Sequence, residues 1–136
     1  MTFTLINPEE MGAPKGWTNG MLAPAGGRLL FVAGQDAALP EGEVETDDFV
    51  EQFRIALEKI MTVVRAAGGE VEDLGRLTMY VADMDEYLAS RKALGPAYQS
   101  VLGRHFPAMA LVQVAGLVDP RARIEIEATA VLAPQP

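Results

Sequence analysis

The feature that most constrains the fold is a long amphipathic helix pattern in residues 46–69. Its apolar residues recur at spacings of three and four and therefore share one face: Phe49, Phe53, Leu57, Ile60, Val64 and Ala67. Thr46 can cap the free N–H groups, with Asp47 and Asp48 at the positive end of the helix dipole. A glycine pair at the end favours a left-handed stop. Because one face of this helix is apolar, it must pack on another layer, which predicts a layered domain.

Strand patterns flank this helix on both sides. The last of them, residues 123–132, alternates strictly and places these residues on one apolar face: Ile124, Ile126, Ala128 and Ala130. Segments 77–81 and 109–117 are rich in apolar and β-branched residues, which is typical of strands. Nearer the N-terminus, a Gly-Gly pair joins the apolar runs 21–25 and 29–33, which predicts a hairpin between two strands.

A second helix pattern follows the central strand and ends at Gly103. Asp83 or Asp85 can cap its start. Gly95 and Pro96 interrupt it, because proline removes a backbone donor and clashes with the carbonyl four residues earlier. Two alternatives follow: the helix kinks there, or a new helix begins with the proline in its first turn.

The element order β-β-α-β-α-β-β predicts a two-layer α+β domain spanning residues 1–136, with two helices on one face of a mixed sheet. Strand 109–117 is apolar on both faces apart from Gln113, so the far face of the sheet is also expected to be covered. No helix pattern remains for that face. Another subunit is the expected cover, and a mean hydropathy of +0.12, high for a small monomer, agrees with this.

The composition narrows the chemistry. The chain has no cysteine and a single histidine, His105, which excludes disulfides and a cysteine nucleophile and makes a metal site unexpected. A net charge of -8 argues against binding nucleic acid, which needs clustered basic charge. No apolar run approaches the length of a membrane helix, and residues 1–6 lack the features of a signal peptide. We therefore expect a soluble cytoplasmic protein with no membrane partner.

Segments spread along nearly the whole chain match the motifs of one known family. They are Phe-Val-Ala-Gly-Gln at 31–35, the helix at 53–60 with its Ala-Ala-Gly-Gly end at 66–69, the strand at 77–81 followed by Asp83, Phe-Pro-Ala at 106–108, and Ile-Glu-Ile-Glu-Ala-Thr-Ala at 124–130. On these residues the chain resembles the RidA/YjgF family of small imine and enamine deaminases, whose members have also been called translation inhibitors and endoribonucleases of the L-PSP type.

The resemblance implies a fold, an assembly and an activity. It implies a chorismate-mutase-like subunit that forms a homotrimer, with the sheets in a central β-barrel and the helices outside. It also implies three clefts between neighbouring subunits, where family members hydrolyse 2-imino or 2-enamine acids to 2-keto acids and ammonia without a cofactor.

The resemblance further implies which residues form the cleft. In active members an arginine directly after the Phe-Pro-Ala turn binds the substrate carboxylate as a bidentate pair, and here that position is Met109. The family's cysteine two residues later is Leu111, its last-strand acid falls on Glu125, and its N-terminal aromatic falls on Trp17. Methionine cannot bind a carboxylate, so a non-standard substrate is implied.

Glu125 is the candidate catalytic residue. A carboxylate on the polar face of the last strand can orient or activate an attacking water. The alternative is a structural carboxylate that pairs with Arg123 or with a cross-strand partner. Glu127, its neighbour on the same face, can equally be a structural ion-pair partner.

Four further residues are candidates for binding a ligand. Met109 and Leu111 would give the cleft an apolar floor that favours a neutral or aromatic ligand, or they belong to the core. Gly34 and Gln35 end a strand, where they either present backbone amides to a ligand or simply form a turn.

Trp17, Arg104 and His105 complete the candidate site. The tryptophan ring would wall the cleft or cap the edge of the core. Arg104 and His105 would replace the missing arginine as an anion anchor from another direction, or they only end the second helix, where positive groups favour its dipole.

Two functions of different classes are therefore predicted. The first is a RidA-like hydrolytic deaminase of reactive imines or enamines, whose substrate lacks the usual carboxylate or binds it differently. The alternative is a noncatalytic small-molecule-binding or regulatory trimer on the same scaffold. A nuclease ranks last, because the chain is acidic.

Overall fold

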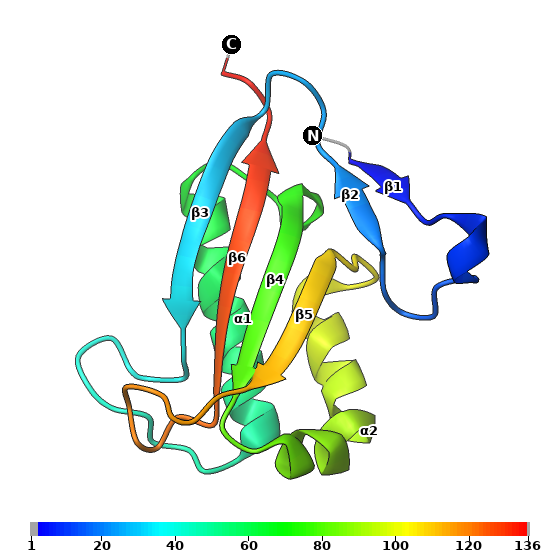
Figure 1. Cartoon of the computed structure of the whole chain (residues 1–136). Helices are drawn as coiled ribbons and strands as arrows, with labels where there is room; N and C mark the ends of the chain where they lie inside the picture. Colours follow the sequence, from blue (N-terminus) through cyan, green and yellow to red (C-terminus); the bar gives the residue numbers. More distant parts are fainter. Residues whose placement is uncertain (1–2, 136) are drawn as a thin grey trace.

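The computed structural model describes residues 3–135, which form a two-layer α+β fold (Figure 1). The large sheet has the strand order β3 (Arg28–Gln35), β6 (Ile124–Leu132), β4 (Leu74–Val81), β5 (Ala108–Gln113). Helices α1 (Phe49–Ala66) and α2 (Met84–Leu102) contact each other and lie on one face of it. Strands β4 and β5 run parallel, and the other neighbours run antiparallel. The predicted fold class is confirmed.

The core lies between α1 and the alternating strand β6. These side chains are completely buried there: Leu57, Ile60, Met61, Val64, Leu77, Ile124 and Ile126. The helix begins two residues later than its Thr46 cap predicts, because Asp48 caps it instead, accepting from the backbone N–H groups of Val50 at 3.0 Å and Glu51 at 3.3 Å. The predicted stop is confirmed, since Gly68 has a φ of +88°.

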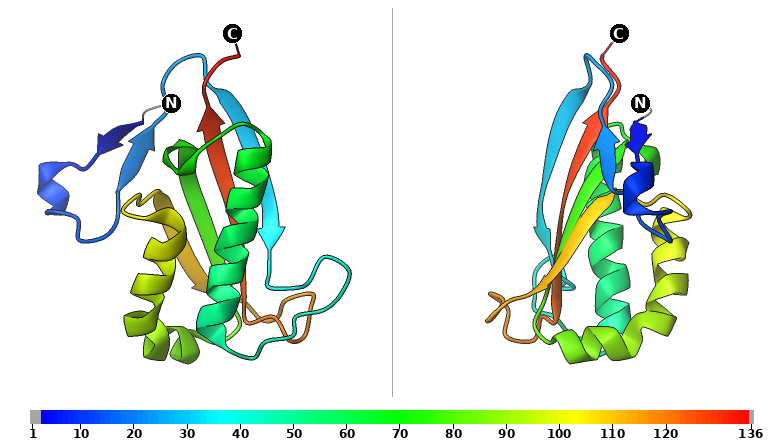
Figure 2. Two further views of the ribbon diagram at one scale, coloured as in Figure 1. Left: turned by 180° about the vertical axis from the view of Figure 1, so that it is seen from behind. Right: turned by 45° about the vertical axis from the view of Figure 1, so that its right-hand side comes forward.

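Helix α2 is one bent helix rather than two. Asp83 caps it by accepting from the N–H of Asp85 at 2.9 Å, and the helix continues through Pro96 to Leu102. In the right-hand view of Figure 2 its first turns run across the bottom and the others run upward, so the kink is the correct alternative. In the described part of the chain, neither α1 nor α2 combines the length and apolarity that a membrane crossing requires.

The predicted hairpin between residues 21–25 and 29–33 is wrong. Strand β2 (Gly20–Leu22) pairs with β1 (Thr4–Ile6), and together with a short 3₁₀ helix (Glu9–Met11) they form a separate N-terminal arm. Pro24 cannot donate to a strand ladder, so pairing stops before the turn. β3 pairs instead with the longer β6, which buries Val32 in the core.

The face of the large sheet opposite the helices carries no helix of the described residues (Figure 2). Strand β5 ends at Gln113, shorter than the predicted 109–117, and has apolar side chains on both faces as expected. On the open face, Phe31 is 75% and Leu29 59% exposed, beside the polar side chains of β4 and β6. An aromatic ring this exposed is a candidate contact for another molecule.

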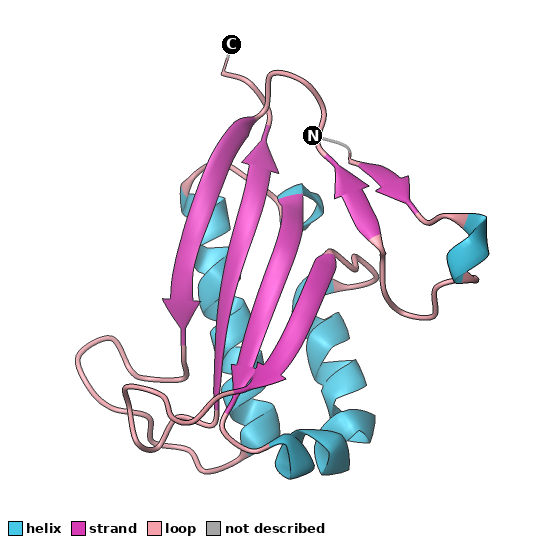
Figure 3. Cartoon of the chain, viewed as in Figure 1, coloured by secondary structure: helices cyan, strands magenta, loops and turns pink. Residues whose placement is uncertain are grey.

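Gln52 joins two loops to the start of α1. The β3–α1 and β5–β6 loops lie together at the lower end of the sheet (Figure 3). The fully buried Gln52 amide donates to the carbonyl oxygens of Thr46 at 2.8 Å and Arg121 at 3.1 Å, and it accepts from the N–H of Arg123 at 2.8 Å. Three backbone groups therefore depend on one side chain.

The substitution Gln52→Leu is expected to lower the free energy of unfolding by about 2–4 kcal/mol, because it leaves these backbone groups without their partner inside the protein. Urea denaturation measures the change. The control Gln99→Leu alters the same type of side chain at an exposed position of α2 and should change stability by less than about 0.5 kcal/mol. Equal effects of the two substitutions would contradict this role.

Candidate functional site

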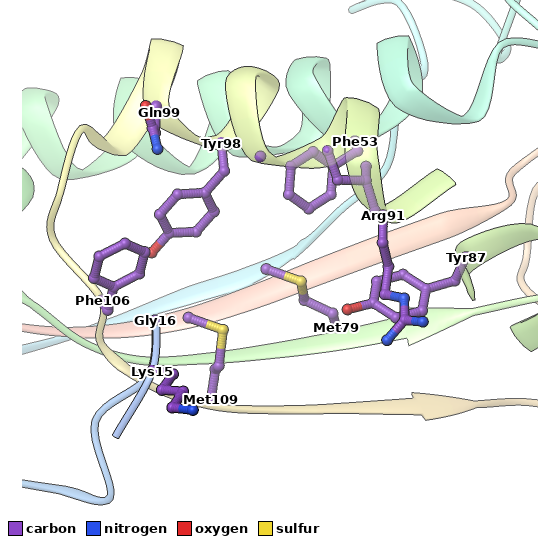
Figure 4. Close-up of a pocket in the computed structure, with 12 residues that line it drawn as sticks. Lys15, Gly16, Phe53, Met79, Tyr87, Arg91, Tyr98, Gln99, Phe106 and Met109 are labelled. Carbon is purple, nitrogen blue, oxygen red and sulfur yellow. The ribbon is translucent and has the colours of Figure 1, made fainter. Parts of the chain in front are cut away.

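A cavity of about 440 Å³ lies between α2 and the helix-facing side of β4 and β5 (Figure 4). This volume is in the range of small-molecule sites. Its lining comes from α1, α2, both strands and the N-terminal arm: Lys15, Gly16, Phe53, Met79, Tyr87, Arg91, Leu94, Gly95, Tyr98, Gln99, Phe106 and Met109. The site residue Met109 therefore contributes to the floor of a cavity.

Two local contacts shape one end of this cavity. The rings of Tyr98 and Phe106 stack with centroids 5.4 Å apart and an interplanar angle of 5°. The Tyr98 hydroxyl donates to the carbonyl oxygen of His105 at 2.6 Å, and burial raises the pKa of this phenol. The Thr18 hydroxyl donates to the carbonyl oxygen of Phe106 at 2.7 Å, which ties the N-terminal arm to the cavity.

Glu125 lies on the opposite, open face of the sheet. Its carboxylate covers the backbone of Gly34 so closely that a Cβ at that position would be 2.5 Å from Oε2. A glycine on β3 thus makes room for the carboxylate on β6. Within residues 3–135, the Glu125 carboxylate forms no side-chain hydrogen bond or salt bridge. Arg123 binds Glu86 instead, so it is not the partner of Glu125.

Glu127 has a defined structural partner on the same face. The Tyr80 hydroxyl on β4 donates to its carboxylate at 2.5 Å. This hydrogen bond stabilises the protonated phenol, and it is the main reason that the pKa of Tyr80 lies above its ordinary value.

Met109 and Glu125 do not meet within one subunit. In the strand register Glu125 is opposite Tyr80 on β4, which in turn is opposite Val112 on β5, three residues beyond Met109. Two strand spacings and three residue rises place their Cα atoms roughly 14 Å apart. The two side chains also point to opposite faces of the sheet, so one chain alone cannot bring them to one ligand.

The other candidate residues lie at several places. Leu111 packs against the core on the side of Met109, and Gln35 ends β3. Trp17 lies on the arm and is 47% exposed. Arg104 and His105 line a separate shallow hollow beyond α2, where the imidazole Nε2 lies 2.7 Å from the carbonyl oxygen of Leu74.

Sequence analysis missed the α2 wall of the cavity. Tyr87, Arg91, Leu94 and Tyr98 follow one another at spacings of four, three and four, which places them on one helix face. This spacing can be read from the sequence, but the arginine interrupts the apolar pattern, so these residues are not recognised as one face that lines a cavity. In the described residues, no group of three or more His, Asp or Glu side chains is arranged to hold a metal ion.

Comparisons with known proteins agree with the fold. The family model described as Endoribonuclease L-PSP matches residues 11–132. The 2-iminobutanoate/2-iminopropanoate deaminase of Escherichia coli strain K12 is 35% identical over 106 residues, which cover 77% of this chain and 80% of that protein.

Two solved structures are also similar to the chain. A protein of unknown function of the conserved Rid family, YyfB from Yersinia pestis, has a TM-score of 0.79 at 32% identity and covers 97% of this chain and 100% of that one. The structure of Escherichia coli TdcF with bound serine has a TM-score of 0.67 at 28% identity, covering 90% of this chain and 92% of that one.

The substitution Glu127→Gln is expected to lower the pKa of Tyr80, because an amide repels the phenolate less than a carboxylate does. Ultraviolet absorbance of tyrosinate during an alkaline titration measures the shift. In a Tyr80→Phe background the same substitution should leave the titration curve unchanged. A curve that Glu127→Gln leaves in place in the otherwise intact chain would refute the hydrogen bond.

Proposed function

Because the chain belongs to the RidA/YjgF family, whose model matches nine tenths of it, we propose that it is a hydrolytic deaminase of reactive imines or enamines, acting as a cytoplasmic homotrimer. The name of the similar Escherichia coli deaminase supports the reaction class. The observation that carries the proposal is the Glu125 carboxylate, which lies over Gly34 and has no hydrogen-bonding or ion-pair partner among residues 3–135. It is therefore free to bind a water molecule.

In the proposed reaction, Glu125 orients water and accepts one of its protons as the oxygen attacks the C=N carbon. A C–O bond forms, the π electrons move to nitrogen, and the nitrogen takes up a proton. The tetrahedral carbinolamine then expels ammonia as its C–N bond breaks and C=O forms, with the water-derived protons ending on nitrogen and the carboxylate restored. Imines hydrolyse readily in water, so positioning and partial desolvation are sufficient for useful acceleration.

The proposed cleft is shared between subunits. Since Met109 and Glu125 lie on opposite faces of one sheet, we place Glu125 and Gly34 of one subunit against the α2 cavity of the next. The exposed Phe31 and Leu29 on the open face support this assembly, because a neighbouring sheet would remove them from water.

The residues that line the α2 cavity differ from those expected in a deaminase of small acids. Met109 stands where an arginine would bind the substrate carboxylate, and Met79 lies beside it on the cavity floor. We infer a substrate that lacks that carboxylate or binds it through another residue. The same observation favours a second candidate, a noncatalytic binding or regulatory trimer, because a protein that no longer catalyses the reaction would not need this arginine.

The substitution Glu125→Gln is expected to lower kcat for imine hydrolysis about a hundredfold, because an amide cannot accept the proton of water. Ammonia release above the uncatalysed rate is measured on a panel of imines generated by amino-acid oxidase, together with imines without a carboxylate. Full turnover by Glu125→Gln on each imine that the wild type hydrolyses would exclude this role. Ligand-induced thermal stabilisation of the wild type without any turnover would favour the binding protein.

The substitution Gly34→Ala keeps the carboxylate but displaces it, since the new Cβ would overlap Oε2 of Glu125. We expect kcat to fall about tenfold, because a small misplacement of a catalytic group slows the reaction. The control Gly116→Ala has no atom within 4 Å of the new Cβ and should leave kcat unchanged. Equal kcat values for the two variants would contradict the claim that catalysis depends on the position of the Glu125 carboxylate over Gly34.

A further inference from the structure

We propose that Arg91 on α2 is the anion-binding residue of the cavity, and that its ligand is a carboxylate with an aromatic or branched apolar side chain. The inference deepens the proposed deaminase function and rests on it for the C=N group of the substrate. The anion site itself can be measured separately from turnover. Arg91 would then bind from the helix the group that Met109 cannot bind from the strand.

The placement of Arg91 follows from helix geometry. It lies one turn after Tyr87 and one turn before Leu94 on the α2 face that looks toward the sheet. Figure 4 shows its side chain extending from α2 beside Tyr87, toward the strand that carries Met79. The guanidinium therefore lies at one end of the cavity, and the stacked pair of Tyr98 and Phe106 lies at the other.

The cavity is a positive site in an acidic chain. Of the described residues that line it, two are cations, Arg91 and Lys15, and none is aspartate or glutamate, although the chain carries a net charge of -8. Other arginines bind carboxylates of the chain: Arg54 with Glu51, Arg121 with Asp47, and Arg123 with Glu86. Among the described residues, neither Arg91 nor Lys15 has such a partner. Both charges remain available to an anion.

The guanidinium is the better of the two cations for a carboxylate. It is planar and rigid and donates two parallel hydrogen bonds to both carboxylate oxygens, whereas the lysine ammonium is a strongly hydrated point charge on a flexible chain. Lys15 lies on the N-terminal arm near Met109, where it adds attraction for the same anion.

The rest of the cavity determines the side chain of the ligand. Its interior wall consists of Phe53, Leu94 and the two stacked rings, and the Tyr98 hydroxyl is already bonded to a backbone carbonyl. These groups offer aromatic and aliphatic contacts and few free hydrogen-bonding atoms. A space of about 440 Å³ is also much larger than an acid of two or three carbons needs, so an aryl or branched aliphatic group fits it better.

Isothermal titration calorimetry with two matched probes tests the inference on the assembled protein. The probes are 3-phenylpropanoate and its neutral isostere 3-phenylpropanamide. Arg91→Gln should weaken binding of the acid about tenfold and leave binding of the amide unchanged, while Arg91→Lys should retain part of the affinity for the acid. Arg65→Gln, which removes an exposed arginine near the end of α1, should change neither affinity.

Three results would overturn the inference. They are a wild type that binds no 3-phenylpropanoate, an Arg91→Gln variant that binds it as tightly as the wild type, and equal losses for the acid and the amide. Thermal unfolding of each variant shows whether it is folded, and Arg91→Lys keeps the test valid if Arg91→Gln is not. Arg91-dependent binding of 3-phenylpropanoate by a protein that releases no ammonia from any imine of the panel would contradict the proposed deaminase and leave the anion site standing.

Discussion

The structure depends on a sheet that its own helices cover on one face. The strict alternation of β6 directs isoleucines and alanines toward α1 and α2, and directs Glu125, Glu127 and Thr129 to the other face. That other face carries the exposed side chains of Phe31 and Leu29 on β3 next to these polar groups. Burying the apolar part of it against a second copy would stabilise the protein by the hydrophobic effect.

This one-sided arrangement also places the candidate functional residues on two different faces of the sheet. The carboxylate over Gly34 belongs to the open face, whereas Met109, Arg91 and the apolar cavity belong to the helix side. The first half is formed where β3 and β6 pair, and the second where α2, which contacts α1, encloses the cavity over β4 and β5. The proposed function therefore requires assembly, because a ligand can meet both halves only where two subunits adjoin.

Much of the fold could be predicted from local patterns. The α1 face, the glycine stop at Gly68 and the alternation of β6 depend on residues close in sequence, and the structure has all three. The hairpin failed because the Gly-Gly turn is a local feature, whereas the choice of partner for β3 is decided by the distant strand β6. The N-cap shifted to Asp48 because several residues there can cap a helix.

The candidate site was only partly accessible to sequence reasoning. The position of Glu125 on the polar face of β6 follows from the alternation of the sequence. Its contact with Gly34 can be predicted only if the pairing of two residues 91 positions apart in the sequence is known. Met109 and Glu125 were expected in a cleft between neighbouring subunits, and the structure adds that within one subunit they occupy opposite faces of the sheet. Arg91 escaped notice because its role depends on the cavity that α2 forms over β4 and β5.

Sedimentation velocity of the wild-type protein at micromolar concentration tests the central claim, that the open sheet face is an interface and the site is completed by a neighbour. The account predicts one stable species with about three times the 14.6 kDa mass of a subunit. A well-behaved monomer that hydrolyses imines at full rate would contradict it.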